Sequence, residues 1–157
     1  MNLLRDYLKD AENFKDENIK VRFLGDRAPL ADDIKALMLK NEDGSKNATG
    51  LKLNIAINYG GRDEIVRAAR RFAALCMEGS CRPEELTEGL FSGLLDTAGI
   101  PDPDLLIRTS GEQRLSNYLL WQLAYTELYV TDCLWPDFNQ EELEKAIVQY
   151  NHRDRRF

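Results

Sequence analysis

Two arginines and a serine follow the apolar residues 105–107 closely enough to form one polar cluster. Arg108 comes directly after the apolar run, and Arg114 and Ser116 follow within one loop. Each guanidinium can grip two oxygens of a phosphate, and a helix that begins at Ser116 would add free backbone N–H groups and a partial positive charge. The cluster therefore predicts an anion site of the phosphate type. The alternative is a capped helix whose neighbouring arginines pair with Glu112 at the surface.

A second polar turn, at residues 60–63, follows another apolar segment. Its glycine pair allows a tight turn and a close approach of the backbone to a ligand. Arg62 could face an anion there, and Asp63 is expected to cap the helix that follows. The alternative is a strand-to-helix turn that binds nothing.

Glu127 stands thirteen residues beyond Arg114, at the start of a further β-prone segment. A carboxylate beside a diphosphate is a natural ligand for Mg²⁺. The alternative is a surface or salt-bridged glutamate. The neighbouring aromatic residues are expected in the core or at a subunit interface; they are Trp121, Tyr125, Tyr129 and Trp135.

Hydrophobic periodicity predicts strands and helices that alternate along the chain. The segment 51–59 is almost continuously apolar, as strands of parallel sheets often are. This order predicts an α/β fold with a mainly parallel central sheet flanked by helices, in a single domain over residues 1–157. In such sheets, ligands bind at the carboxyl ends of the strands. Helices are expected over 2–13, 30–40, 63–78, 83–95, 117–125 and, capped by Asn139, 140–151, and strands over 19–26, 51–59, 104–109 and 126–132.

The composition narrows the possible classes of function. The chain has 157 residues, 43% of them apolar, which suffices for one hydrophobic core. Its net charge of −6 argues against a general nucleic-acid binder. No apolar run approaches the roughly 20 residues of a membrane span, so a soluble, cytoplasmic protein is expected. Cys76, Cys81 and Cys133 are expected as reduced thiols, with a local Cys76–Cys81 disulfide as the alternative, and His152 as a solvated or capping residue.

Several long segments resemble the cis-prenyltransferase family, the undecaprenyl diphosphate synthases in particular. They read LNIAINYGGRDEIVRA, DPDLLIRTSGEQRLSNYLLWQLAYTELY and LWPDF, followed by the terminal RRF, and they stand in the family's order. The resemblance implies an enzyme that condenses isopentenyl diphosphate onto an allylic diphosphate to make a Z-polyprenyl diphosphate carrier lipid. It also implies Mg²⁺ as cofactor, a homodimer, and peripheral membrane contact through the lipid product.

The same resemblance assigns roles to individual residues. It implies that Glu127 takes part in binding Mg²⁺. Gln113 stands where some members carry a histidine near the metal, which leaves that contact open. Arg156 and Phe157 match part of a tail that reaches the partner subunit's site, although the glycine that follows in the family is missing here. The residues implied to bind the diphosphate of isopentenyl diphosphate are Arg108, Arg114, Leu115 and Ser116.

One family motif has no match in this sequence. Family members begin with a strand and a loop similar to Met-Asp-Gly-Asn-Gly-Arg-Trp, whose aspartate serves magnesium binding and catalysis. Nothing like it occurs here, so the chain is expected to correspond to the C-terminal two-thirds of a synthase, with no catalytic residue of its own. We therefore expect it to be inactive or nearly so by itself, and the sequence does not indicate the length of the product.

Two other classes of protein compete with a truncated synthase. One is a non-catalytic partner subunit that dimerises and completes another chain's site. Such partners typically lose the binding residues that this chain keeps, which favours the truncated synthase. The other is a general phosphate-binding module, which the length of the matched segments disfavours.

Overall fold

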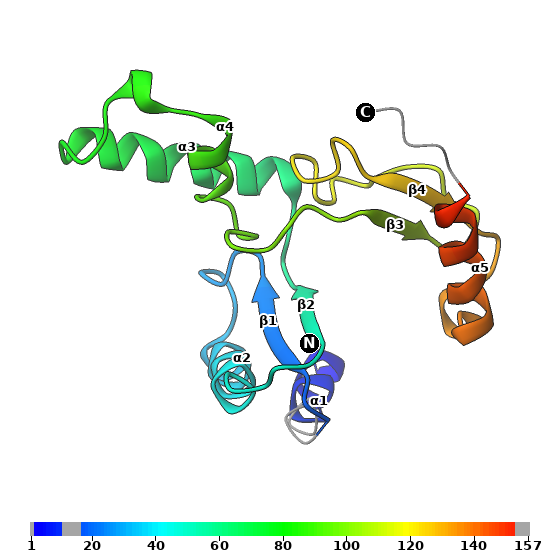
Figure 1. Ribbon diagram of the computed structural model, residues 1–157. Coiled ribbons are helices and arrows are strands. Elements are labelled where there is room, and N and C mark those ends of the chain that lie inside the picture. The colour runs from blue at the N-terminus through cyan, green and yellow to red at the C-terminus, as the bar shows by residue number, and fades with distance from the viewer. Residues whose placement is uncertain (1, 11–16, 153–157) are drawn as a thin grey trace. The chain divides into compact units, whose positions relative to one another are not determined.

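The computed structural model describes residues 2–10 and 17–152 of the chain (Figure 1). The chain divides into two compact units, Met1–Ala98 and Gly99–Phe157. Each unit contains one pair of parallel strands with helices beside it. The expected α/β class with parallel strands is therefore confirmed, whereas a single domain over the whole chain stays a prediction.

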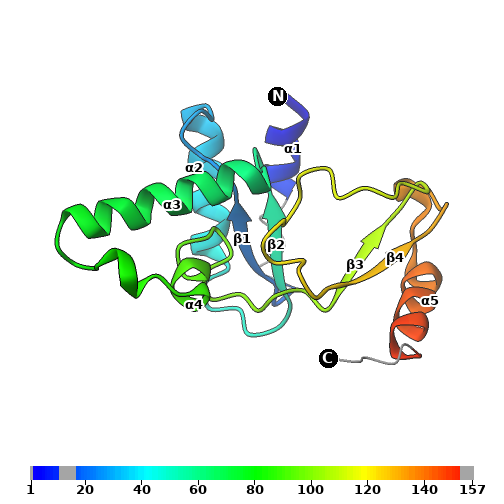
Figure 2. The same ribbon diagram turned by 90° about the horizontal axis from the view of Figure 1, so that it is seen from above.

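The first unit is built around a parallel pair formed by β1 (Lys20–Leu24) and β2 (Lys52–Ala56). The helices α1 (Asn2–Asp10) and α2 (Asp32–Gly44) pack against each other beside these strands (Figures 1 and 2). Alternate residues of β1 point into the core, because successive side chains of a strand lie on opposite faces. The main cluster of buried apolar residues in this unit comprises Leu8, Val21, Phe23, Ile34 and Met38.

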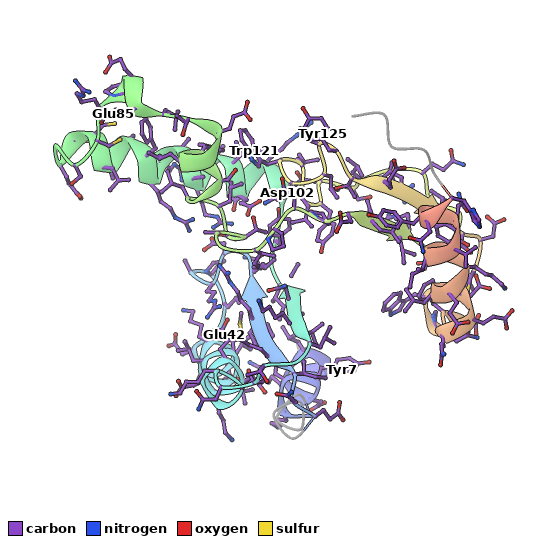
Figure 3. The ribbon with its side chains drawn as sticks, in the orientation of Figure 1. Tyr7, Glu42, Glu85, Asp102, Trp121 and Tyr125 are labelled. Carbon is purple, nitrogen blue, oxygen red and sulfur yellow. The ribbon has the colours of Figure 1, made fainter. Side chains whose placement is uncertain are left out.

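Side chains at the end of α2 bind the backbone of β1. The N–H of Val21 donates to Ser45 Oγ at 3.0 Å, and the N–H of Phe23 donates to Glu42 Oε1 at 2.9 Å. Arg27 holds Glu42, labelled in Figure 3, through guanidinium bonds of 2.9 and 2.6 Å. These contacts supply partners for backbone donors in the interior, where an unpaired N–H would be costly.

The helix α3 (Gly61–Met77) begins with a buried acidic residue that ties it to the rest of the first unit. Glu64 is fully buried, and its carboxylate accepts the N–H of Asp96 at 2.8 Å. Asp96 in turn accepts two bonds from Arg67, of 2.8 and 2.7 Å, and the N–H of Gly25 at 3.1 Å. This network fastens the turn after β1 and the segment around residue 96 to α3.

The expectation that Asp63 caps this helix is wrong. The helix starts two residues earlier than expected, and the N-cap position falls on Gly60, which has no side chain to accept a bond. Asp63 lies inside the first turn and pairs with Arg67 at 2.7 Å. Its charge near the helix N-terminus is favourable even without a capping bond.

The expected helix over 83–95 is two short elements, η2 (Pro83–Glu85) and α4 (Glu88–Ser92). Leu86 and Thr87 between them have extended backbone, with ψ of 116° and 164°. The side chain of Thr87 then caps α4 by accepting a backbone N–H at 3.1 Å. A good capping residue in the middle of the segment therefore interrupts the helix.

The second unit contains β3 (Leu105–Arg108) and β4 (Glu127–Val130), which pair in parallel, and α5 (Gln140–Asn151), which packs on β4 (Figures 1 and 2). A short 3-10 helix, η3 (Trp135–Asp137), precedes α5. Asn139 caps α5 as expected, because its Oδ1 accepts a backbone N–H of the first turn at 3.2 Å.

The expected helix over 117–125 is absent, and this part of the chain forms successive turns. Ser116, Asn117 and Leu119 have positive φ angles of 51°, 62° and 45°, which a right-handed helix cannot contain. Without the helix, Ser116 is not an N-cap, and no helix N-terminus faces the arginine cluster from this segment. The physical support for the anion site must come from side chains.

The remaining expectations concern the cysteines, His152, membrane-spanning helices and the two ends of the chain. The three cysteines are free thiols, and His152 lies exposed at the C-cap of α5. Among the described residues, no helix has the length and apolar character needed to cross a membrane. Residues 11–13 of the first expected helix, and the tail residues Arg156 and Phe157, lie outside the described residues.

Candidate anion-binding site

A cavity of about 300 Å³ lies in the second unit and contains most of the cluster expected from the sequence. Arg108 and Val130, which end β3 and β4, both line it, so it lies at the carboxyl end of a parallel pair, where α/β folds place ligands. The residues that line it are Leu106, Arg108, Glu112, Gln113, Arg114, Leu115, Leu128 and Val130.

Backbone hydrogen bonds hold the loop that carries the polar residues of this cavity. The N–H of Ser110 donates to the carbonyl of Cys133, and the N–H of Gly111 donates to the carbonyl of Thr131, each at 2.9 Å. Ser110 and Gly111 both have positive φ, 64° and 66°, which turns the chain sharply after the strand. The loop is thereby fixed to the segment that follows β4.

Arg108 leaves part of its hydrogen-bonding capacity unused. Its Nη2 donates to Ser116 Oγ at 3.3 Å, which brings these two expected ligand residues together. Its Nε is buried and has no hydrogen-bond partner among the described residues. An unsatisfied donor of a charged group costs about 1–3 kcal/mol or more, so an oxygen of an anionic ligand would relieve a real deficit.

Arg114 is in a different state, because its Nη1 pairs closely with Glu112 Oε2. The Arg114 side chain is 66% exposed and that of Glu112 is 36% exposed, so this ion pair lies at the open side of the cavity. The Arg–Glu112 pairing considered as an alternative to the anion site is therefore real for Arg114. It does not involve Arg108, whose buried Nε still lacks a partner.

Apart from Leu115, the apolar side of the cavity was not expected from the sequence. Leu106 and Arg108 stand two residues apart on β3, as Leu128 and Val130 do on β4, so each pair shares one face of its strand. Leu115 adds a further apolar contact from the loop. The sequence does contain a signal for these positions. Side chains two residues apart share one face of a strand, so Leu106 lies on the same face of β3 as Arg108.

Glu127 does not join the arginines. It begins β4 and pairs with Leu105, whereas Arg108 ends β3 and pairs with Val130. Arg108 lies three residues beyond Leu105, so Arg108 and Glu127 are about 10 Å apart along the strand direction. The structure thus places the expected metal ligand at the opposite end of the strand pair from the expected diphosphate ligands.

A second cavity of about 300 Å³ contains Glu127 instead. Asp102 and Tyr125, both labelled in Figure 3, line it together with Asp104 and Tyr150. Although several carboxylates border this cavity, no group of three or more His, Cys, Asp or Glu residues among the described ones could hold a metal ion. The described residues therefore do not by themselves complete a Mg²⁺ site.

Two of the aromatic residues expected in the core or at an interface are largely exposed. Tyr125 is 80% exposed and Trp135 is 72% exposed. Trp135 stacks on Phe138, with ring centroids 6.1 Å apart. A core position is therefore wrong for Tyr125 and Trp135, and the subunit interface considered beside it stays a prediction.

Parallel strands with an arginine-lined cavity at their carboxyl ends define an α/β protein with a candidate site for a phosphate-type anion. The family model described as putative undecaprenyl diphosphate synthase matches residues 1–157. The chain belongs to this prenyltransferase family, as the resemblance of its motifs implied.

Individual relatives agree with this assignment. The chain is 49% identical to an isoprenyl transferase of Prochlorococcus marinus subsp. pastoris, with 100% of this chain and 58% of the relative covered. It is 46% identical to a ditrans,polycis-undecaprenyl-diphosphate synthase ((2E,6E)-farnesyl-diphosphate specific) of Legionella pneumophila, over 95% of this chain and 63% of the relative. The chain thus spans about six tenths of the length of these curated relatives.

A solved structure supports the fold. Lavandulyl diphosphate synthase from Lavandula x intermedia, in complex with dimethylallyl diphosphate, is similar with a TM-score of 0.92 and 38% sequence identity. The similarity covers 99% of this chain and 68% of that chain. The cis-prenyltransferase fold expected from the sequence is therefore confirmed.

Proposed function

We propose that this chain holds the diphosphate of isopentenyl diphosphate within a cis-prenyltransferase that condenses it onto an allylic diphosphate. The product would be a Z-polyprenyl diphosphate carrier lipid, as in an undecaprenyl diphosphate synthase. The name of the Legionella relative states specificity for farnesyl diphosphate, which we adopt as the allylic substrate. The observation that carries the proposal is that Arg108, whose buried Nε has no hydrogen-bond partner among the described residues, lines the cavity.

The two sides of the cavity suit the two parts of this substrate. Arg108 and Arg114 offer charge-assisted donors to the oxygens of a diphosphate, and Ser116 steadies Arg108. Leu106, Leu128 and neighbouring apolar side chains offer contacts for a short hydrocarbon group. Such a site would orient the homoallylic nucleophile, which is a contribution of positioning rather than of bond breaking.

We further propose that these 157 residues do not turn over substrates by themselves. Ionising an allylic diphosphate requires groups that stabilise the leaving diphosphate, and the aspartate loop that the family resemblance implies for this task does not occur in the sequence. Mg²⁺ remains a proposed cofactor on the strength of the resemblance alone. Glu127 would need ligands from outside the described residues to hold it.

We also propose that the protein is a homodimer. Exposed apolar residues on α5 and the exposed aromatic residues Tyr125 and Trp135 supply a surface for a second copy. A cytoplasmic location and contact of the lipid product with a membrane stay predictions. A role as a non-catalytic partner subunit is the alternative, and retention of Arg108, Arg114 and Ser116 argues against it.

The first prediction concerns Arg108 and is measured by titration calorimetry with inorganic pyrophosphate and with isopentenyl diphosphate. Arg108→Gln should weaken binding of both ligands by about tenfold or more, because a charge-assisted bond to a partly buried guanidinium is lost. Arg70→Gln, which removes an exposed arginine from α3, is the matched control and should leave affinity unchanged. Equal binding by the wild type and Arg108→Gln would remove the basis of the proposed site.

A second arm of the same experiment measures turnover of the wild-type chain. Farnesyl diphosphate, labelled isopentenyl diphosphate and Mg²⁺ should give no chain elongation with this polypeptide alone. Robust elongation would contradict the proposal that the chain holds only one part of the catalytic machinery, and it would leave the binding result intact.

A further inference from the structure

The two arginines of the cavity differ in one respect that the proposed function does not explain. Arg108 has a buried Nε without a partner among the described residues, whereas Arg114 is already bound by Glu112. Glu112 is itself part of the cavity lining, so the carboxylate occupies space beside the donors that an anionic ligand would need. In its present pairing, Nη1 of Arg114 is engaged by Glu112 and is not available to a ligand.

We propose that Glu112 is an affinity-setting residue that competes with the anionic ligand for Arg114. With the cavity empty, the Glu112 carboxylate binds the guanidinium in place of phosphate oxygens. When a diphosphate enters, Arg114 must exchange Glu112 for the ligand, and the freed carboxylate stays near the ligand's negative charge. This inference rests on the proposed diphosphate site and adds a residue that acts against binding there.

The size of the effect follows from the exposure of the pair. Both side chains are more than one third accessible to solvent, and ion pairs in such positions contribute little because water screens them. A ligand with several negative charges can therefore displace the carboxylate. Repulsion between Glu112 and that ligand adds to the effect, so removing the carboxylate should tighten binding by about threefold to tenfold rather than by orders of magnitude.

The loop geometry supports an exchange of partners without refolding. Backbone bonds from Ser110 and Gly111 fix the start of the loop to the segment after β4. Glu112 and Arg114 follow this anchor on the same short segment. Their side chains can separate by rotation, and the fixed backbone keeps both beside the cavity.

The test is calorimetric titration of inorganic pyrophosphate into the wild type and Glu112→Gln in buffer without divalent cations. Glu112→Gln should bind about threefold to tenfold more tightly. Glu144→Gln is the matched control, since it removes the same charge from an exposed position on α5 and should change affinity by less than about twofold. Circular dichroism of each variant verifies that the fold is retained.

A double substitution separates competition from a general charge effect. Arg114→Gln should weaken pyrophosphate binding. Glu112→Gln should then improve the affinity of the Arg114→Gln variant by less than it improves that of the wild type, because Glu112 opposes binding by pairing with Arg114. An affinity of Glu112→Gln equal to that of Glu144→Gln, or weaker than that of the wild type, would overturn the inference while leaving the site itself in place. Absence of pyrophosphate binding in every protein, Glu112→Gln included, would overturn the inference and the proposed site together.

Discussion

The loop beside the cavity turns sharply at a glycine, Gly111. Gly111 has φ of +66°, a left-handed conformation that residues with a Cβ adopt at a cost. A Cβ at this position would lie 2.8 Å from Oδ1 of Asp132. Because Asp132 is exposed and its carboxylate can move, the backbone conformation is the larger obstacle to substitution.

Gly111→Ala should therefore lower the free energy of unfolding by about 1 kcal/mol and weaken pyrophosphate binding, since the loop that positions Glu112 and Arg114 would shift. Urea denaturation and calorimetry measure the two effects. Gly89→Ala is the control: it lies in α4, a Cβ added there would have nothing within 4 Å, and alanine favours a helix. An unchanged affinity in Gly111→Ala would show that the loop conformation does not govern the site.

Arg108 and Glu127 show what could be inferred about the site from the sequence. The apolar run before Arg108 correctly indicated a strand that delivers a charged residue to its carboxyl end. Glu127 was correctly expected at the start of a strand, and in a parallel pair the start of one strand lies at the far end from the finish of its neighbour. Proximity in sequence and family role suggested one site, but strand direction separates the two residues.

At the scale of secondary structure, elements with strong local signals were predictable. The segment 140–151 is a helix because Asn139 caps it and acidic residues fill its first turn. The expected helix over 117–125 failed although its apolar spacing suited a helix, since positive φ angles at Ser116 and Asn117 direct the chain into turns. The spacing of apolar residues does not report such backbone angles.

The network that joins α3 to the turn after β1 depends on Asp96 and predicts a pH dependence. Burial alone would raise the pKa of Asp96, but the hydrogen bonds and charge of Arg67, the charge of Arg71 and the N–H of Gly25 outweigh it and hold the pKa below its usual value. A carboxyl group with a lower pKa in the folded than in the unfolded chain stabilises the fold above the unfolded pKa, about 4. That contribution is lost as the pH falls below about 4 and through the folded pKa.

Asp96→Asn should lower the free energy of unfolding by about 3 kcal/mol at pH 7, because it leaves Arg67 without its buried partner. The difference from the wild type should shrink as the pH falls below about 4. Asp63→Asn removes the exposed partner of the same arginine and should cost less than about 1 kcal/mol. Urea denaturation of the three proteins from pH 7 to pH 3 tests this, and a difference that does not vary with pH would contradict the role given to the charge.

At the scale of the whole molecule, the second unit leaves apolar side chains of α5 exposed. Ala146 of α5 is buried, while Leu143 and Ile147 on the same helix are exposed. Residues four apart on a helix share one face, so these two side chains form an exposed stripe that runs beside the buried Ala146. Exposed apolar stripes of this kind are typical of association surfaces.

A second copy of the chain is the partner that we propose for this stripe. The wild type should elute as a dimer in size-exclusion chromatography with light scattering, and Leu143→Glu combined with Ile147→Glu should give a monomer because it buries two charges at the contact. Leu39→Glu places the same charge on an exposed apolar position of α2 and should remain dimeric. A wild type that is monomeric at every concentration would contradict the homodimer. A dimer that dissociates with Leu39→Glu but not with the double substitution on α5 would show that the interface lies on the first unit.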